Sequence, residues 1–255
     1  MTSNFRPTER FSTKVENYVK YRPHYPPAAL DLLRRECGLT PDWVIADIGS
    51  GTGISSELFV ANGNRVHGVE PNAAMRAAGE AHFAAAANFV SVAGTAEETT
   101  LPDASIDLVI AGQAFHWFEH DRARREFVRI LRPGGWLVLM WNSRDDGVPF
   151  QQEYEKFVLE FGTDYSEIRH QNLTDDVLGQ FYAPAEMRVA RFKQAQTVDF
   201  EGLAGRVLSS SYMPGPAHPR HKELLADLRR LFEQYQVEGR LALDLITMIY
   251  YGRLR

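Results

Sequence analysis

Short apolar runs alternate with helix-like segments through the middle of the chain. Continuous apolar stretches such as "DLVIA" and "WLVLMW" are typical of parallel strands that are covered on both faces. Between these runs, apolar residues recur at intervals of three and four, which indicates helices. This alternation predicts a parallel sheet with right-handed crossovers. The predicted strands are 43–48, 65–70, 88–93, 106–111 and 135–141, and the predicted helices are 53–62, 72–86, 95–100 and 121–131.

The chain on either side of this core has a different pattern. Ahead of it, helices are predicted at 9–20 and 26–36, separated by "YRPHYPP", whose prolines fix a kinked connection. Beyond it, alternation of apolar and polar residues predicts strands at 187–200 and 240–254. A strand that closes a parallel sheet late in the chain is often an antiparallel edge member. Further helices are predicted at 150–161, 174–181, 200–211 and 219–236.

Gly49, Gly51 and Gly53 occupy alternate positions directly after the first predicted strand, in "IADIGSGTGISS". Glycine is favoured in such a loop where φ is positive or where another group comes very close. A strand, a glycine loop and a helix N-terminus together are the local geometry of a nucleotide-type site. The alternative is a helix-capping turn in which the glycines are incidental.

The spacing of these glycines differs from that of a dinucleotide-binding loop, in which a third glycine would stand at Ile54. Here Asp47 precedes the loop, and Glu70 ends the second predicted strand, 21 residues after Gly49. In other doubly wound folds a carboxylate at that position accepts both hydrogen bonds of a ribose diol. The pattern therefore favours a ligand that has a ribose but no phosphate.

The composition is that of an ordinary soluble globular protein, with 255 residues, 44% of them hydrophobic and 24% charged. The net charge of −5 gives no general electrostatic footprint for nucleic acid. The single cysteine, Cys37, excludes an intramolecular disulfide and a cysteine-built zinc site. The start "MTSNFRPTERFSTK" is polar, and no apolar run approaches the roughly 18 residues of a membrane span. We expect a cytoplasmic protein without a metal site.

Four segments in fixed order resemble a known family. "DIGSGTG", "GVEPN", "AGTAEETTLPDASIDLVIAGQAFHWF" and "RILRPGGWLVLMWN" resemble the ordered motifs of class I S-adenosylmethionine-dependent methyltransferases of the type 11 group. "YVKYRPHYP" and "HWF" narrow the likeness to the branch that includes trans-aconitate methyltransferase. The glycine loop alone would be a weak signal, but four motifs in this order are specific.

The resemblance implies an α/β fold with a Rossmann-like, seven-stranded mixed sheet. The sheet would be mostly parallel, with one antiparallel strand near the C-terminus, helices on both faces and a helical cap. We expect one domain over residues 1–255, in which 1–42 form an N-terminal helical cap and 43–142 the cofactor-binding core. Residues 143–255 would supply substrate-side helices and the closing strands.

The resemblance also implies S-adenosylmethionine as cofactor and assigns residues to it. Asp47 would hold the methionine amino group, and Glu70 would bind the ribose hydroxyls. Ala96 and Glu97 would read the adenine edge, although Glu97 could instead be a solvated acid favoured by a nearby helix dipole. The full set of cofactor-binding residues implied is Asp47, Gly49, Ser50, Gly51, Thr52, Gly53, Glu70, Pro71, Met75, Thr95, Ala96, Glu97 and Gln113.

Residues for the methyl acceptor come from two clusters, "QAFHWFEHDR" and "NYVKYRPHYP". His116 follows the fourth predicted strand, where it could take a proton, bind the substrate or pack beside Trp117. Arg22 could grip a carboxylate with two hydrogen bonds, either that of the cofactor or that of an acidic substrate, or it could lie on the surface. We take His116 and Arg22 as candidate catalytic residues. Tyr18, Tyr25, Trp117, Arg144 and Tyr212 are candidate substrate-side residues.

The sequence therefore favours methyl transfer to a small molecule, to an oxygen atom of an acidic or polar metabolite. A nicotinamide-dependent oxidoreductase is a second hypothesis, which the absence of a glycine at Ile54 disfavours. A third is a protein that binds S-adenosylmethionine without catalysis. Nucleic-acid methylation is disfavoured because "GQAFHW" replaces the loop that base methylation uses, whereas a lipid or quinone acceptor stays open. The pattern contains no signal for the oligomeric state.

Overall fold

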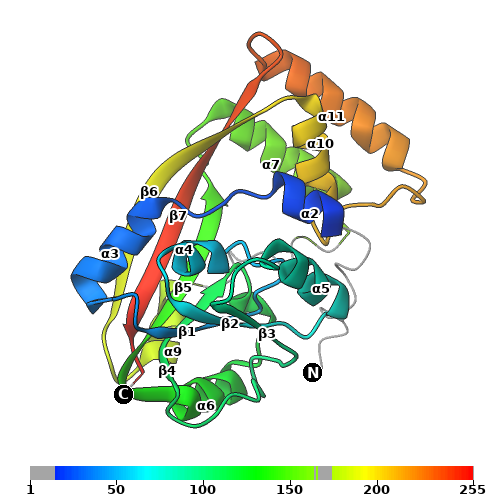
Figure 1. Cartoon of the computed structure of the whole chain (residues 1–255). Helices are drawn as coiled ribbons and strands as arrows, with labels where there is room; N and C mark the ends of the chain where they lie inside the picture. The colour runs from blue at the N-terminus through cyan, green and yellow to red at the C-terminus, as the bar shows by residue number, and fades with distance from the viewer. Residues whose placement is uncertain (1–14, 164, 166–173, 255) are drawn as a thin grey trace.

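The described residues, 15–163, 165 and 174–254 of a computed structural model, form a seven-stranded sheet (Figure 1). The strand order is β3-β2-β1-β4-β5-β7-β6. The strands are β1 (Val44–Ile48), β2 (Arg65–Val69), β3 (Phe89–Val92), β4 (Ile106–Gly112), β5 (Leu131–Arg144), β6 (Met187–Val198) and β7 (Leu241–Arg253).

Strand β7 is the reversed member of the sheet, because it pairs antiparallel with both β5 and β6. The pairs among β1, β2, β3, β4 and β5 are all parallel. The prediction of a mostly parallel, Rossmann-like sheet with one antiparallel strand near the C-terminus is therefore confirmed. Strand β5 begins earlier than predicted, since Leu131 already pairs with Ile106 before the register shifts at the following turn.

Helices cover both faces of the sheet. On one face, α3 (Pro27–Cys37) and α4 (Ser56–Ala61) bury Leu33 and Phe59 against Ile45 and Ile110. On the other, α6 (His120–Ile130) and α9 (Asp175–Tyr182) pack on alternate residues of the same strands. The helix α5 (Ala73–His82) follows β2. Burial on both faces explains why the central strands are continuous apolar runs.

A second apolar cluster lies at the far end of β6 and β7, above the core in Figure 1. It is built by α7 (Pro149–Phe161), α10 (Phe200–Leu208) and α11 (His221–Tyr235). Val198 and Leu241 belong to it, and they pair with each other at the end where β6 finishes and β7 begins. These two strands have 12 and 13 residues, so they extend beyond the 5-residue strand β1 and carry this group of helices, which we call the cap.

The helix α2 (Val15–Tyr21) lies between the cap and the core and packs on α10 and α5 (Figure 1). The Tyr21 hydroxyl donates a hydrogen bond of 2.7 Å to Glu201 of α10. The connection from α2 to α3 is tied to the sheet by Asn142, whose amide nitrogen donates to the carbonyls of Pro23 and His24. The predicted helix 9–20 is thus confirmed only over its second half, and residues 9–14 lie outside the described residues.

Two helix predictions were wrong in detail. Residues 95–100 form no helix, because this segment is a loop in which Thr100 has a φ of +63°. Helix α4 begins at Ser56 rather than at residue 53, since Gly51 and Gly53 have φ values of +57° and +93°, which lie outside the helical region.

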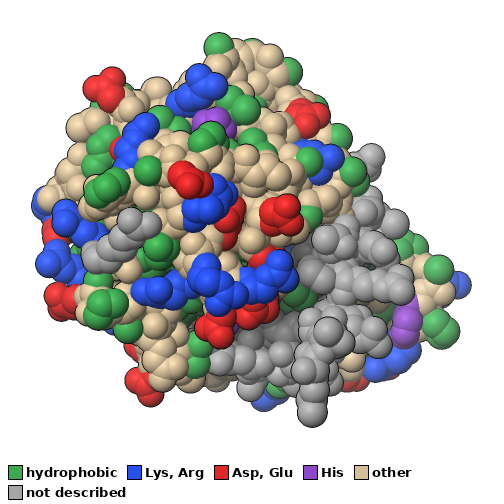
Figure 2. Space-filling model, turned by 90° about the horizontal axis from the view of Figure 1, so that it is seen from below, with side chains coloured by type: hydrophobic (Ala, Val, Ile, Leu, Met, Phe, Trp, Pro, Cys, Tyr) green, Lys and Arg blue, Asp and Glu red, His purple; other side chains and the backbone are tan. Residues whose placement is uncertain are grey.

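The lower face of the molecule, around α6, carries mixed charge. Figure 2 shows basic and acidic side chains interspersed on this face, with no separation into fields of one sign. Within α6 the exposed side chains include Arg122 and Arg125 beside Asp121. Such a surface gives no strong potential of one sign over α6.

Gly205 supplies a test of how α2 is held. A Cβ atom on Gly205 would lie 2.1 Å from the ring of Tyr21, so Gly205→Ala should displace α2 although alanine favours the helix α10. We expect faster hydrogen exchange over residues 15–21 and a loss of about 1–2 kcal/mol in the free energy of unfolding. Gly179→Ala in α9 is the matched control, because no atom lies within 4 Å of its added Cβ; it should stabilise by about 0.5–1 kcal/mol. Equal exchange in both variants would contradict this packing.

Candidate active site

The predicted site residues gather at the carboxyl ends of the parallel strands. Gly49 follows β1, Glu70 follows β2 and Gln113 follows β4. In a parallel sheet these ends lie along one edge, and in open α/β folds ligands bind in the crevice outside it. Strands β1 and β4 are neighbours in the sheet, although they are far apart in sequence, so their loops lie beside one another.

The glycine loop is needed for both backbone conformation and space. Gly49 has a φ of +69°, and its added Cβ would lie 2.7 Å from the Cβ of Ala114, in the loop after β4. A Cβ on Gly53 would lie 2.4 Å from the ring of Phe83. Gly53 therefore makes room for packing against the end of α5, whereas Gly49 allows two neighbouring loops to touch.

A cavity of about 860 Å³ lies over this loop. It is open to solvent and brings together most of the residues that the sequence assigned to the cofactor. Those that line it are Gly49, Gly51, Glu70, Pro71, Met75, Thr95, Ala96, Glu97 and Gln113. Ser50 lines a smaller adjoining cavity. Asp47, Thr52 and Gly53 are not among the residues that line either one.

Asp47 lies fully buried beneath the glycine loop. Its Oδ2 atom accepts hydrogen bonds of 2.7 and 2.6 Å from the hydroxyls of Ser55 and Ser56. Its Oδ1 atom has no hydrogen-bond partner among the described residues. Burial raises the pKa of Asp47 to about 6, although the two serines oppose this shift. A buried carboxylate with one unused oxygen fits the amino group of a methionine moiety.

Glu70 is held in place by two backbone groups. Its Oε2 accepts a hydrogen bond of 3.0 Å from the N–H of Gly51, and its Oε1 accepts one of 2.8 Å from Asn72. Burial raises the pKa of this carboxyl, and the hydrogen bonds from Asn72 and Gly51 oppose the shift. Each oxygen retains a lone pair, so the carboxylate is oriented to accept from a diol.

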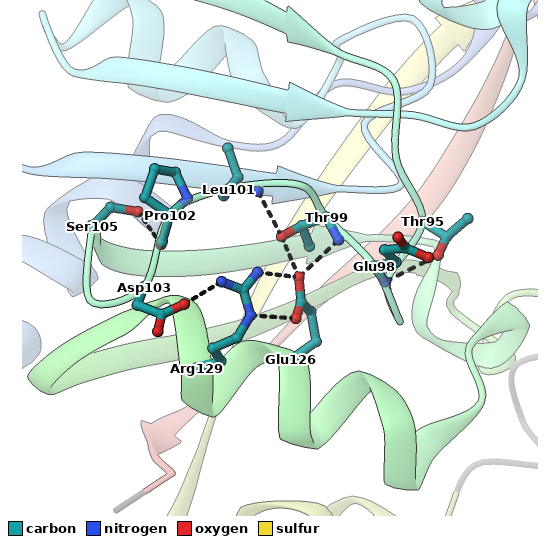
Figure 3. Close-up of polar contacts among 9 residues, drawn as sticks. All are labelled: Thr95, Glu98, Thr99, Leu101, Pro102, Asp103, Ser105, Glu126 and Arg129. Atoms are coloured by element: carbon teal, nitrogen blue, oxygen red, sulfur yellow. Dashed lines mark hydrogen bonds and ion pairs between the residues drawn. The ribbon is translucent and has the colours of Figure 1, made fainter.

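The loop that carries Ala96 and Glu97 is anchored by α6 (Figure 3). Oε1 of Glu126 accepts hydrogen bonds of 2.8 and 2.6 Å from the backbone and hydroxyl of Thr99. Arg129 binds both oxygens of the same carboxylate and reaches Asp103, on the far side of the loop. This network fixes the loop wall of the cavity. Glu97 itself accepts a hydrogen bond of 2.8 Å from the N–H of Glu119, directly before α6, so it both lines the cavity and lies at a helix start.

A second cavity, of about 990 Å³, adjoins the first and shares Tyr18, Gln113 and Trp117 with it. Gln113 has a φ of +58°, which is strained for a residue with a side chain, and its amide donates to the carbonyl of Asn142. The residues that line this second cavity include all but one of the candidate acceptor residues, namely Tyr18, Arg22, His116, Trp117, Arg144 and Tyr212. Tyr25 lines the smaller cavity between the two.

Arg22 points from the α2–α3 connection towards the cap. Its guanidinium donates hydrogen bonds of 2.9 and 3.2 Å to the hydroxyls of Ser209 and Ser210. It also lies 4.9 Å from the ring centroid of Tyr18. Arg144 differs, because it forms an ion pair with Glu155 and binds the hydroxyl of Tyr165.

Further residues that line the same cavity, and that were not predicted from the sequence, include Arg206, Gln151, Tyr154 and Tyr165. Arg206 lies on α10 and donates a hydrogen bond of 2.5 Å to Gln196. It forms no ion pair with any described carboxylate, and burial lowers its pKa to about 10, so it is still charged at neutral pH. No local motif marks Arg206; only the packing of α10 on β6 brings it to the site.

The described residues contain no cluster of His, Cys, Asp and Glu that could hold a metal ion. Among the same residues, none of the helices is long and apolar enough to cross a membrane. The site consists of two adjoining cavities, of which the first presents carboxylates and the second presents guanidinium groups.

Comparisons with known proteins agree with this geometry. A Methyltransferase domain model of type 11 matches residues 46–139. An uncharacterized methyltransferase of Mycobacterium bovis is 32% identical over 218 residues, which are 84% of this chain and 82% of the relative.

Two solved structures have the same fold. One is described as a candidate type II methyltransferase from Anaeromyxobacter dehalogenans, with a TM-score of 0.66, 24% identity and coverage of 92% of this chain and 98% of that one. The other is an S-adenosylmethionine-dependent methyltransferase from Geobacter sulfurreducens in complex with S-adenosylhomocysteine. It has a TM-score of 0.54, 16% identity and coverage of 96% and 98%.

The fold and site thus define a class I methyltransferase whose cofactor is S-adenosylmethionine. The chain belongs to the type 11 methyltransferase family. The individual cofactor contacts of Asp47, Glu70 and Glu97 stay predictions, as does the trans-aconitate branch.

Asp47 predicts how cofactor binding depends on pH. An amino group can be accepted only by the ionised carboxylate, and the pKa of Asp47 is raised to about 6, so binding should require loss of a proton below that pH. Calorimetry should show the affinity for S-adenosylhomocysteine falling about tenfold per pH unit below pH 6. Asp47→Asn should bind weakly without this dependence, whereas Glu70→Gln, the control for the neighbouring carboxyl, should retain it. A flat profile in the native protein would contradict the role of Asp47.

The pKa of Glu126 predicts how the stability of the fold around this loop depends on pH. Burial alone would raise its pKa, but hydrogen bonds from Arg129 and Thr99 hold the pKa of Glu126 at about 2. Since this lies below the usual value, the carboxylate stabilises the fold above about pH 4.5 and this stabilisation is lost as the pH falls towards 2.

Glu126→Gln should therefore flatten the acid limb of stability, measured by denaturant unfolding from pH 2 to 7. It should also weaken S-adenosylhomocysteine binding by about 3- to 30-fold, because a neutral amide loses the hydrogen bond of its second oxygen with Arg129 and holds Thr99 less strongly. Glu233→Gln, in an exposed pair with Arg229, should change neither quantity. Native-like binding by Glu126→Gln would show that the loop holds its position without α6.

Proposed function

We propose that this methyltransferase transfers the methyl group of S-adenosylmethionine to an oxygen atom of a small acidic metabolite. The observation that carries the proposal is the charge of the second cavity, which Arg22, Arg144 and Arg206 line together. Of these three arginines, only Arg144 forms an ion pair with a carboxylate of the described residues. A partly buried guanidinium without a counterion is costly, so an anionic ligand would complete the site.

Oxygen is the favoured acceptor atom because the site needs little acid–base chemistry for it. S-adenosylmethionine supplies a methyl group on a sulfonium, which is already activated, so the protein aligns and desolvates the two partners. A carboxylate oxygen attacks without losing a proton. A hydroxyl oxygen loses one, and His116, which lines the second cavity beside Trp117, would be its base.

The border between the cavities supports transfer from one to the other. Tyr18, Gln113 and Trp117 line both, so a ligand in each would meet across these residues. We further propose that residues 1–255 act as one domain, because β6 and β7 run from the core into the cap.

A screen of small metabolites with isotopically labelled methyl donor tests the proposal, and we expect mono- and dicarboxylic acids among the accepted compounds. Arg206→Gln should raise the KM for the best acid about 10- to 100-fold, since a charge-assisted hydrogen bond is lost. Arg22→Lys should retain part of the affinity that Arg22→Ala loses, because an ammonium cannot form the planar fork.

Arg229→Gln is the matched control, as this arginine lies in an exposed pair on α11. It should leave the KM unchanged. Preference for neutral lipophilic acceptors, with rates indifferent to Arg22 and Arg206, would refute the acidic acceptor and leave methyl transfer intact.

A further inference from the structure

We infer that the acceptor is a hydroxy acid, whose hydroxyl group donates a hydrogen bond to Gln151. This inference deepens the proposed function and rests on it, because the acidic part of the molecule would lie on the arginines. Gln151 would then distinguish hydroxy acids from other acids, because it binds the hydroxyl group whereas the arginines bind the carboxylate.

Gln151 belongs to the first turn of α7 and is 2% exposed. Its amide nitrogen donates a hydrogen bond of 3.0 Å to the backbone carbonyl of Asp244 in β7. This bond fixes which end of the amide is nitrogen and which is oxygen. The side chain lines the second cavity, and its Oε1 atom has no hydrogen-bond partner among the described residues.

A buried carbonyl oxygen without a donor costs free energy that an apolar side chain of similar size would avoid. The arginines around it can only donate, and two of them already bind protein oxygens, Arg22 those of Ser209 and Ser210 and Arg206 that of Gln196. The Nε of Arg144 is likewise buried without a partner. The cavity therefore presents guanidinium donors, which suit a carboxylate, together with the acceptor oxygen of Gln151, which needs an O–H or N–H.

Charge decides between these two donors. Three guanidinium groups line the cavity, and Glu155, on Arg144, is the one described carboxylate that pairs with any of them. An ammonium group would be repelled by the remaining positive charge, whereas a hydroxyl is neutral. A hydroxyl group therefore satisfies Gln151 without the electrostatic cost of an ammonium group.

Binding to protein saturated with S-adenosylhomocysteine tests this without knowledge of the natural acceptor. Calorimetry would compare acids that differ by one hydroxyl: lactate with propionate, 3-hydroxybutyrate with butyrate, malate with succinate, and 2-hydroxyglutarate with glutarate. We expect the hydroxy acid of the best-binding pair to bind about 10- to 100-fold more tightly. Aspartate, which carries an ammonium in place of the hydroxyl of malate, should bind more weakly than malate.

Gln151→Met removes the acceptor oxygen at similar volume and should reduce the preference within each pair to about threefold or less. Gln152→Met is the matched control, because the next residue is exposed and its amide binds the carbonyl of Asp146. It should keep the full preference. Both variants should bind S-adenosylhomocysteine as the native protein does, which shows that the first cavity is intact.

Equal binding of hydroxylated and plain acids by the native protein would overturn the inference and leave the acidic acceptor standing, whether or not Gln151→Met folds. An unchanged preference in Gln151→Met, or tighter binding of aspartate than of malate, would overturn it as well. Failure of every acid to bind would overturn the acidic acceptor itself, and the inference with it.

Discussion

The contact between the loops after β1 and β4 is the constraint on which the site depends. Gly49 approaches Ala114 so closely that a Cβ atom would overlap it, and this contact joins two segments that are distant in sequence. Strand order reverses at this point: β2 and β3 lie on one side of β1, whereas β4 and β5 lie on its other side. The crevice at such a switch point is where open α/β sheets bind ligands. A side chain at Gly49 would separate the two loops and would disrupt the cavity that Glu70 and Gln113 line together.

The cap depends on the long strands that leave this core. Because β6 and β7 extend past the other strands, they carry α10 and its Arg206 over the carboxyl edge of the sheet. Gln196 of β6 accepts from Arg206 and donates to the backbone carbonyl of Tyr21. The same side chain thus orients a cavity residue and holds the end of α2. Asn142 of β5 has a similar double role. Its side-chain amide nitrogen donates to the α2–α3 connection, and its backbone carbonyl accepts from the side chain of Gln113.

The part of the site that could be predicted from sequence is the part that local geometry determines. Asp47, the glycine loop and Glu70 each follow directly from a strand end, so a motif a few residues long places them. Arg206 and Gln151 could not be found this way, because each reaches the cavity through the packing of a helix on β6 or β7. The helix predicted at 95–100 failed for a related reason. Its Thr99 donates its backbone and hydroxyl hydrogen bonds to Glu126 of α6 and not to a partner within a helix turn, and Glu126 is 27 residues away.

The two cavities differ in charge in a way that matches the reaction. Asp47, Glu70 and Glu97 lie at the first cavity or beneath it, whereas Arg22, Arg144 and Arg206 line the second. S-adenosylmethionine carries a net positive charge, because its amino group and its sulfonium outweigh its one carboxylate, and the proposed acceptor carries negative charge. Each ligand would therefore be attracted to its own cavity and repelled from the other. The residues common to both cavities, Tyr18, Gln113 and Trp117, carry no formal charge at neutral pH. Attraction between the two ligands can then act directly along the line of transfer, where the acceptor oxygen has to approach the methyl carbon.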